Sequence, residues 1–518
     1  MRFFRLTLIS IVLPGLLNLT SLHAATEIFE RENYPKRLGL SAYLARPGIR
    51  SRLSTLRIAV LDNGFGDFAD QPAGEYLPAK TRLLAQYPVP GNALNADRHG
   101  LSMAQMVWAA TGSSADGPEF LLLNANGMTQ LRRAIQFAID ERVDVILYSQ
   151  NWEYGGNFDG RGFINAEVSK ATRAGILWIN AAGNYGGQVY DGPLALPGPD
   201  QTLRLVNRFD ENRVRFVVSW SDFREVEAYQ TSLDLDVEVL DSNGKVVARG
   251  DRVQRETPGP ARGEITLHAR ELFSATLDRG DFFLRLVRRA GVFPSNLRVR
   301  AWVSSERPET PIELLDRSRG REIMIPADHP EVLAVGDLSE QSAQGPTSDG
   351  RSKPDLLLDH SEVRFTNGMM TSGTSNAAAL FAGIALVMKA HDPTIDRDRL
   401  LSVRPDFSTC LYPVERSRVS DTVWGLLERF TGQPRTALPV GIARDGRITV
   451  LTGQEPAYLG SLFGEARAWI EQRGQSVQAF RFFLSMVGEA VFAARTMIAG
   501  PALPGDVQGD GSLRWVEV

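Results

Sequence analysis

Hydrophobic and polar positions follow two periodic patterns along the chain. Between residues 56 and 200, short apolar runs such as LRIAVLD (56–62) and EFLLLNA (119–125) alternate with stretches whose apolar residues recur every three or four positions, as in MTQLRRAIQFAIDERV (128–143). The short runs are typical of buried strands, and the longer spacing is typical of amphipathic helices. Strands and helices that alternate in this way predict an α/β fold, with a parallel sheet covered by helices on both faces.

The second pattern begins near residue 201. Apolar and polar residues now alternate one by one, as in RVRFVVSWSD (213–222) and LDLDVEVLDSNGKVVARG (233–250). A period of two is typical of half-buried strands, and the Asn-Gly pair in the second stretch is a strong hairpin signal. We therefore predict an all-β sandwich inserted at 202–304. The first pattern, of apolar runs and helical stretches, resumes with the apolar run EVLAVGDLS (331–339).

The N-terminus has a pattern of its own. Residues 1–24 carry Arg2 and Arg5 ahead of an apolar stretch that ends in small residues. This pattern is typical of a secretory signal peptide, which would be cut after Ala24 or Ala25. An uncleaved membrane anchor is the alternative.

The C-terminal region combines a predicted hairpin at 440–453 with a helical pattern at 455–499. Within it, the apolar stretch 479–499 is long enough to span a bilayer, but charged residues interrupt it. Charges make a membrane-spanning helix costly. We therefore expect a docked or surface helix and no transmembrane anchor in the mature chain.

These patterns divide the chain into six segments. They are a signal peptide (1–24), an N-terminal extension (25–55), the first part of the α/β domain (56–201), the β insert (202–304), the second part of the α/β domain (305–400) and a C-terminal extension of hairpin plus helices (401–518). The α/β domain is thus expected to form from two segments that are distant in sequence.

Composition narrows the possible functions. With 43% hydrophobic and 23% charged residues and a formal net charge of −4, the 518-residue chain has an ordinary soluble composition. No basic run or charge imbalance indicates nucleic acid or an anionic membrane as a partner. The single cysteine, Cys410, excludes an internal disulfide and argues against a cysteine-based metal cluster. Export without disulfides is typical of bacteria, so we expect a periplasmic or extracellular protein.

A serine is the first candidate for chemistry. The stretch MTSGTSNAAALFAGIALVMKAH (370–391) predicts a helix that is apolar all round, and such a helix belongs in the core. Ser375 lies in its first turn, where unpaired N–H groups and the positive end of the helix dipole would stabilise an alkoxide and an oxyanion. Serine and threonine also cap helices for hydrogen-bonding reasons alone, so a plain N-cap is the alternative.

A serine nucleophile needs a base, and the base needs an orienting carboxylate. Of the six histidines, only His99 begins a predicted helix directly after a loop. Asp62 ends the strand pattern IAVLD, and Asn184 ends the pattern ILWINAAGN. Taken singly, a strand-end Asp or Asn is usually a turn residue. Taken together, these residues are expected to gather at the carboxyl edge of the sheet, where function concentrates in such folds.

Six segments, in the family's order, resemble those of the subtilisin-like serine proteases, the subtilases, and four of them carry the candidate catalytic residues. IAVLDNG (58–64) resembles the aspartate segment of that family, HGLSMAQMV (99–107) the histidine segment, INAAGN (179–184) the oxyanion segment and SGTSNAAALFAG (372–383) the serine segment. The order Asp, His, Ser is that of subtilisin. The resemblance implies a subtilisin-like fold with a jelly-roll-like insert, and an enzyme that hydrolyses peptide bonds.

The resemblance also implies roles for individual residues. Asp62 would orient His99, His99 would act as the general base, Ser375 would attack the substrate, and Asn184 would help to hold the oxyanion. No cofactor is implied for catalysis. Structural calcium is possible, and the oligomeric state stays open.

The segment that would dock the substrate departs from the family pattern. Where the family has Ser-Leu-Gly-Gly, this chain has the candidate substrate-binding residues Ser149, Gln150, Asn151 and Trp152. Their bulk puts ordinary docking of an extended peptide in doubt. Further departures leave every catalytic group in place; they are Leu101 and Ser102 in the histidine segment, and Asn376 and Ala379 in the serine segment.

We therefore expect a secreted serine endopeptidase that acts on peptides or proteins. A catalytically weak or inactive relative that binds peptides or a partner protein is the main alternative, because the docking segment is altered. A second alternative is an esterase of the α/β-hydrolase type, but no Gly-x-Ser-x-Gly elbow surrounds Ser375. A third is a binding scaffold centred on the β insert.

Overall fold

The structure is a computed structural model of the chain. It describes residues 34–402, except 67, 69–75, 85–97, 195–200, 255–265, 308, 319, 359–360 and 366–369, together with the short strands β19 (Leu411–Tyr412), β20 (Val440–Ile442) and β21 (Ile448–Val450). Strands β20 and β21 form an antiparallel pair inside the predicted hairpin. The predicted signal peptide and the apolar stretch 479–499 lie outside the described residues. No helix among the described residues is long and apolar enough to cross a membrane.

An eight-stranded sheet forms the centre of the α/β domain. Its strands, in the order β19-β16-β15-β5-β4-β1-β3-β2, include β1 (Arg57–Asp62), β2 (Arg82–Leu84), β3 (Glu119–Asn124), β4 (Val145–Tyr148), β5 (Leu177–Ala181), β15 (Leu333–Asp337) and β16 (Leu356–Leu358). These seven strands are parallel, and only the edge strand β19 runs antiparallel. Every residue of β4, β5, β15 and β16 is buried, which is why these strands are continuous apolar runs.

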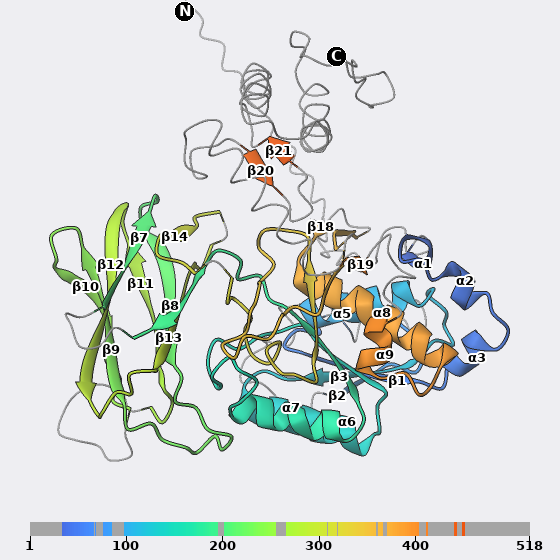
Figure 1. Ribbon diagram of the computed structural model, residues 1–518. Helices are drawn as coiled ribbons and strands as arrows, with labels where there is room; N and C mark the ends of the chain where they lie inside the picture. Colours follow the sequence, from blue (N-terminus) through green and yellow to red (C-terminus); the bar gives the residue numbers. More distant parts are fainter. Residues whose placement is uncertain are drawn as a thin grey trace, which may run out of the picture.

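Helices cover both faces of this sheet, as the sequence predicts. They are α1 (Tyr34–Arg37), α2 (Ser41–Leu44), α3 (Ile49–Leu53), α5 (His99–Ala110), α6 (Met128–Asp140), α7 (Phe163–Arg173), α8 (Thr374–His391) and α9 (Arg397–Ser402). Because side chains alternate along a strand, Val60 packs with α5 and α8 on one face, whereas its neighbour Leu61 packs with α6 and α7 on the other. Figure 1 shows these two helix pairs on opposite sides of the sheet.

Helix α8 runs through the core, which confirms the expectation from its apolar pattern. All of its residues are buried except Ser375 and His391 at its two ends. It packs closely against α5: a β-carbon on Gly383 would lie only 2.3 Å from Cβ of Ala110. The short antiparallel strands β17 (Val363–Arg364) and β18 (Met370–Thr371) lead into this helix. The position of Ser375 is therefore fixed by a rigid buried element.

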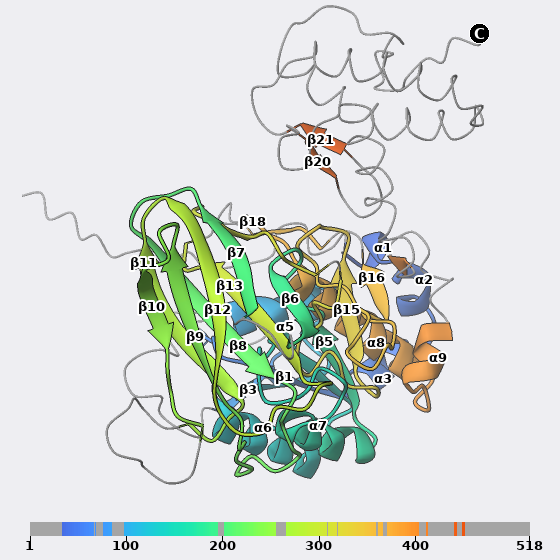
Figure 2. The same ribbon diagram turned by 60° about the vertical axis from the view of Figure 1, so that its left-hand side comes forward.

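Two antiparallel sheets form the inserted β domain, and they lie face to face beside the α/β domain (Figure 1; Figure 2). One has the order β10-β9-β12-β7-β14 and the other the order β11-β8-β13-β6. Their strands are β6 (Val189–Pro193), β7 (Gln201–Asn207), β8 (Asn212–Trp220), β9 (Asp234–Asp241), β10 (Val246–Gly250), β11 (Arg270–Leu277), β12 (Gly280–Ala290), β13 (Arg298–Ser305) and β14 (Ile312–Leu314). Strands β6 and β14 lie outside 202–304, and the domain boundaries stay a prediction.

The four-stranded sheet of the β domain contacts the loop that follows β4. Along β8, Val218 joins the core between the two sheets, whereas Ser219 turns to the α/β domain and donates a hydrogen bond to the carbonyl of Glu153 at 3.0 Å. Just after β8, Phe223 exchanges two hydrogen bonds with the side chain of Asn157, at 2.9 and 3.1 Å. The β domain therefore holds a loop that begins beside the predicted docking segment.

His329 is a buried histidine remote from the predicted catalytic residues in sequence. Its Nδ1 accepts a hydrogen bond from the N–H of Glu331 at 3.1 Å, and its Nε2 lies 2.8 Å from Oγ of Ser169. The ring is therefore neutral, with its proton on Nε2. Burial, together with the nearby charges of Lys353 and Arg351, lowers the pKa of His329 to about 4.

We expect His329 to make the fold sensitive to acid. Because its folded pKa lies below the ordinary value of about 6.5, the unfolded chain binds a proton first as the pH falls. Between pH 7.5 and 4.5 this histidine should lower the free energy of unfolding by about 2.5 kcal/mol. Urea unfolding at both pH values checks this, with His329→Gln as the comparison. An equal pH-dependent loss in the wild type and the variant would contradict the expectation.

Candidate active site

The strand order of the main sheet reverses between β1 and β4. From β1 the chain moves to β2 and then β3 on one side, and from β4 it moves to β5 on the other. In open parallel sheets, the carboxyl ends of strands at such a reversal are where ligands bind. Asp62 is the last residue of β1, and His99 is the first residue of α5, the helix that follows.

Asp62 and His99 are joined by a hydrogen bond of 2.8 Å between Oδ2 and Nδ1. Asp62 is fully buried, and its Oδ1 accepts hydrogen bonds from the N–H of Asn63 at 2.7 Å and from Nε2 of Gln150 at 3.1 Å. Because an ionised carboxylate can only accept, Nδ1 carries the proton. The basic nitrogen of the ring is then Nε2, the atom that a general base uses.

Gly100 allows this close approach of α5 to β1. A β-carbon at this position would lie 2.6 Å from Cβ of Asp62 and 2.7 Å from the carbonyl oxygen of Gly64. Any larger residue would push the start of α5 away from the end of β1. Glycine directly after His99 is therefore what lets the imidazole reach Asp62.

Ser375 is the second residue of α8, and it does not cap the helix. The N-cap position belongs to Gly373, which has no side chain that could cap the helix. The hydroxyl of Ser375 instead donates a hydrogen bond to the carbonyl oxygen of Ser149 at 3.2 Å. The plain N-cap alternative is therefore wrong, because the hydroxyl faces the predicted docking segment and not its own helix.

Asn184 lies beside the start of α8, three residues beyond the end of β5. Its Oδ1 accepts hydrogen bonds from both the N–H and the hydroxyl of Thr374, each at 3.1 Å. Thr374 is fully buried and its hydroxyl also accepts from the N–H of Gly183 at 3.0 Å. This arrangement fixes the amide so that Nδ2 remains as the donating side. Together with the N–H of Ser375, unpaired within the first helical turn, Nδ2 can stabilise an oxyanion.

We expect Asn184→Ala to lower kcat for peptide hydrolysis by about 10²–10³-fold, because one oxyanion donor is lost from the transition state. KM should change little, since the ground-state carbonyl needs this donor less. Steady-state kinetics with a peptide substrate checks the split. Asn157→Ala, which removes a part-buried loop amide bonded to Phe223, is a matched control. A change in KM alone would contradict the oxyanion role.

The structure brings three of the four predicted docking residues to this edge of the sheet. Ser149 contacts Ser375 and Gln150 contacts Asp62, as described above. Asn151 accepts a hydrogen bond from Nδ2 of Asn180 at 3.3 Å. Their role in binding a substrate stays a prediction.

Trp152 is engaged differently. Its N–H donates to the carbonyl of Ile325 at 2.7 Å, and its carbonyl accepts from the N–H of Ile325 at 3.2 Å. Its indole Nε1 donates to the hydroxyl of Tyr148 at 2.8 Å. The main-chain groups of Trp152 are already paired in this structure, so they are not available to an added substrate strand.

Two supporting contacts were not predicted from the sequence. Thr374 holds Asn184, and Gln150 bonds to Asp62 as well as lying in the docking segment. A threonine directly before Ser375 is a signal that could have indicated the first contact. No local pattern indicates the second, because 88 positions separate Gln150 from Asp62.

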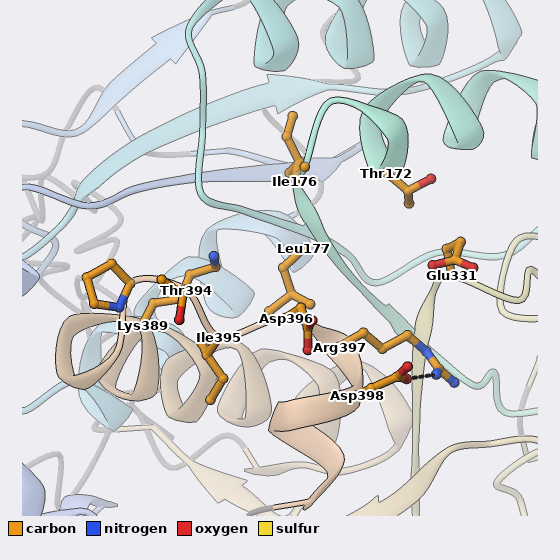
Figure 3. A pocket seen from close by; sticks show the side chains of 12 residues that line it. Thr172, Ile176, Leu177, Glu331, Lys389, Thr394, Ile395, Asp396, Arg397 and Asp398 are labelled. Carbon is orange, nitrogen blue, oxygen red and sulfur yellow. Dashed lines mark hydrogen bonds and ion pairs between the residues drawn. The ribbon is translucent and has the colours of Figure 1, made fainter.

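A cavity of about 310 Å³ lies at the other end of α8 (Figure 3). Lys389, one of its lining residues, follows Ser375 by 14 positions along the helix, a distance of about 21 Å. This cavity is therefore separate from the candidate active site.

Within the described residues, no group of three or more His, Cys, Asp or Glu side chains is arranged to hold a metal ion.

The profile of the Subtilase family matches residues 54–403. This match covers more than half of the chain, so the protein belongs to the subtilase family, whose members are mostly serine peptidases. The matched region includes every residue of the site described above. A search of the curated proteins finds no match.

Solved structures of proteases are also similar to this chain. The CspB protease of Clostridium perfringens is 16% identical with a TM-score of 0.45, over 72% of this chain and 90% of that one. A cold-adapted subtilisin-like serine proteinase is 12% identical with a TM-score of 0.29, over 68% and 81% of the two chains. A psychrophilic protease, S41, is 12% identical with a TM-score of 0.31, over 69% and 87%.

Proposed function

We propose that the protein is a serine endopeptidase that hydrolyses peptide bonds in peptide or protein substrates. The observation that carries the proposal is the 2.8 Å hydrogen bond between buried Asp62 and His99. The adjacent residues Ser149 and Gln150 link this pair to Ser375, because Ser149 bonds to Ser375 and Gln150 bonds to Asp62. Asn184 and the N–H of Ser375 add two donors for an oxyanion. An acyl-transfer site needs these groups and no cofactor.

In the proposed mechanism, Oγ of Ser375 attacks the scissile carbonyl while Nε2 of His99 takes its proton. Asp62 stays ionised and stabilises the imidazolium. His99 then gives the proton to the leaving nitrogen, and water repeats the sequence to release the acyl group. In this structure the Ser375 hydroxyl donates to the Ser149 carbonyl, and it must break this hydrogen bond in order to donate to Nε2 of His99. Catalytic hydrogen bonds often form fully only once substrate is bound.

We also propose that the protein is exported to the periplasm or the medium. The charged, apolar and small-residue pattern of residues 1–24 supports this proposal, as does a sequence with a single cysteine. N-terminal sequencing of the protein from cell fractions tests it: a start at about residue 25 in an exported fraction is expected. An intact N-terminus confined to the cytoplasm would overturn this proposal.

Labelling with a fluorophosphonate tests the catalytic proposal. This probe phosphonylates only an activated serine, so the adduct should map to Ser375 by peptide mass spectrometry. The label should fail to form when His99 is replaced by alanine, because the base is then missing. An adduct on another serine, or none on a folded protein, would refute the assignment.

One observation favours a second function, a subtilase that binds peptides or a partner without cleaving them. The main chain of Trp152 is paired with Ile325, so part of the docking segment is occupied. Such a protein would bind peptides in a titration but would neither hydrolyse them nor react with the fluorophosphonate. The same experiment therefore distinguishes the two functions.

A further inference from the structure

Two side chains fill the space between the docking segment (149–152) and the segment that leads to Asn184. A β-carbon built on Gly183 would lie 2.5 Å from Cδ2 of Tyr185 and 3.2 Å from Nδ2 of Asn151. The ring of Tyr185 therefore lies directly against the main chain of Gly183, and Asn151 approaches from the facing segment. Where the family has glycine in the docking segment, this chain carries the asparagine.

The geometry of the reaction shows which part of a substrate would need this space. The attacked carbon has four substituents in the tetrahedral intermediate. One is Oγ of Ser375, the second is the oxyanion beside Asn184, and the third is the leaving nitrogen, which must face His99 to be protonated. The fourth, the Cα of the residue on the acyl side, is left to the wall formed by Ser149, whose carbonyl lies 3.2 Å from the nucleophile. Asn151, two positions after Ser149, reaches the same point of Gly183 as the Tyr185 ring, so we expect that residue's side chain to need the space that Asn151 and Tyr185 fill.

The β domain holds Tyr185 in this position. The hydroxyl of Tyr185 donates to Oε1 of Glu153 at 2.9 Å, and Ser219 of β8 holds the carbonyl of Glu153 at 3.0 Å. Trp302 of β13 packs edge-to-face against the Tyr185 ring, with the centroids 5.4 Å apart and the planes at 79°. The Trp302 indole is in turn bonded to Gln188 at 3.3 Å. Both contacts to Tyr185 therefore depend on the four-stranded sheet.

The electrostatics of Glu153 and Tyr185 also favour the position of the Tyr185 ring against Gly183. Burial raises the pKa of Tyr185 well above its ordinary value, so its hydroxyl stays a neutral donor. Burial also raises the pKa of Glu153, against the opposing effects of the Tyr185 hydrogen bond and of Arg215 and Arg270. Moving the tyrosine away would leave a desolvated carboxyl group without this donor, which is costly. Tyr185 is thus held by packing and by a hydrogen bond.

We propose that Tyr185 and Asn151 restrict the residue on the acyl side of the scissile bond to glycine or alanine, and that the β domain imposes the restriction by holding Tyr185 against Gly183. A branched or aromatic side chain needs the volume that these two residues occupy. The inference rests on the proposed peptidase function and adds a substrate class to it.

Four quenched fluorescent peptides, identical except for Gly, Ala, Leu or Phe before the scissile bond, test the inference. The wild type should prefer Gly or Ala over Leu and Phe by at least about 10-fold in kcat/KM. Tyr185→Ala should raise kcat/KM for the Leu or Phe peptide by at least about 10-fold. Tyr185→Phe keeps the ring but not the hydroxyl, and as the matched control it should keep the wild-type ranking.

Trp302→Ala tests the contribution of the β domain. Freed from its edge-to-face contact, Tyr185 should admit larger side chains, so the ranking should shift partway toward that of Tyr185→Ala. The rate of fluorophosphonate labelling should stay unchanged, because Trp302 does not touch the triad. A variant that loses thermal stability but keeps the wild-type ranking would show that Trp302 has only a structural role.

Labelling separates failure of this inference from failure of the proposed function. If Ser375 is not labelled in the wild type, the peptidase function itself is refuted. If Ser375 is labelled, the inference is overturned when the wild type cleaves after Phe as well as after Ala, when Tyr185→Ala leaves the ranking unchanged, or when neither protein cleaves any of the four peptides. A labelled wild type that cleaves none of them, beside a Tyr185→Ala variant that cleaves after Leu or Phe, supports it.

Discussion

Replacing Ser375 with alanine is expected to lower kcat for peptide hydrolysis by about 10⁶-fold. In the proposed mechanism the Ser375 hydroxyl forms the acyl intermediate, and water cannot occupy its place with the same alignment. Stability should change little, because the side chain is partly exposed and makes a single hydrogen bond, to Ser149. Hydrolysis of a quenched peptide and thermal unfolding measure the two effects.

Ser372→Ala is the matched control for this substitution. Ser372 is an exposed serine just before α8, three residues before the nucleophile. Its loss should leave both hydrolysis and fluorophosphonate labelling within about two-fold, since exposed serines away from the reacting atoms contribute little. Hydrolysis by Ser375→Ala within 10-fold of the wild-type rate would mean that another group attacks the substrate.

Asp62→Asn is expected to lower kcat by about 10⁴-fold, with the fold retained. The amide keeps the oxygen that accepts from Asn63 and Gln150, but it places an NH₂ group where Oδ2 accepts from His99. Nδ1 of His99 must then become the acceptor, which moves the ring proton to Nε2. A protonated Nε2 cannot take the proton of Ser375, so the base is lost although the side chains stay in place.

Asp144→Asn serves as the control for Asp62→Asn. Asp144 lies at the opposite edge of the same sheet, just before β4, where it accepts a hydrogen bond from the N–H of Arg57 at 2.8 Å. This substitution should leave kcat unchanged within a few-fold while carrying the same change in charge. If Asp62→Asn retained more than about a tenth of wild-type kcat, Asp62 would not be setting the tautomer of His99.

The two hydrophobic patterns of the sequence predicted the architecture well. The α/β fold and the antiparallel β domain are both confirmed. Strands buried on both faces give continuous apolar runs, and strands buried on one face give alternating apolar and polar residues, so the sequence pattern shows both kinds. The same reasoning predicted that α8 is buried. It did not predict that β6 and β14 join the sheets of the β domain. Strand β14 has only three residues, and β6 contains Asp, Gly and Pro, which are rare in strands.

The candidate site was predicted from residues at element ends. Asp62 and His99 were expected at the carboxyl edge because they follow a strand pattern and begin a helix pattern, and the structure brings them together. The sequence also raised the possibility that Ser375 merely caps its helix. Only the position of Gly373, and the direction of the hydroxyl toward Ser149, excluded that alternative.

The fold class, the order of most elements and the edge of the sheet at which Asp62, His99, Ser375 and Asn184 lie could be predicted from the sequence. These follow from local periods and from element ends, which are encoded within a few residues. The tertiary structure alone decided that Trp152 pairs with Ile325 and that Tyr185 lies against Gly183 under the β domain. Such contacts join segments that are distant in the chain, or depend on how a side chain packs between domains, and no local pattern records them.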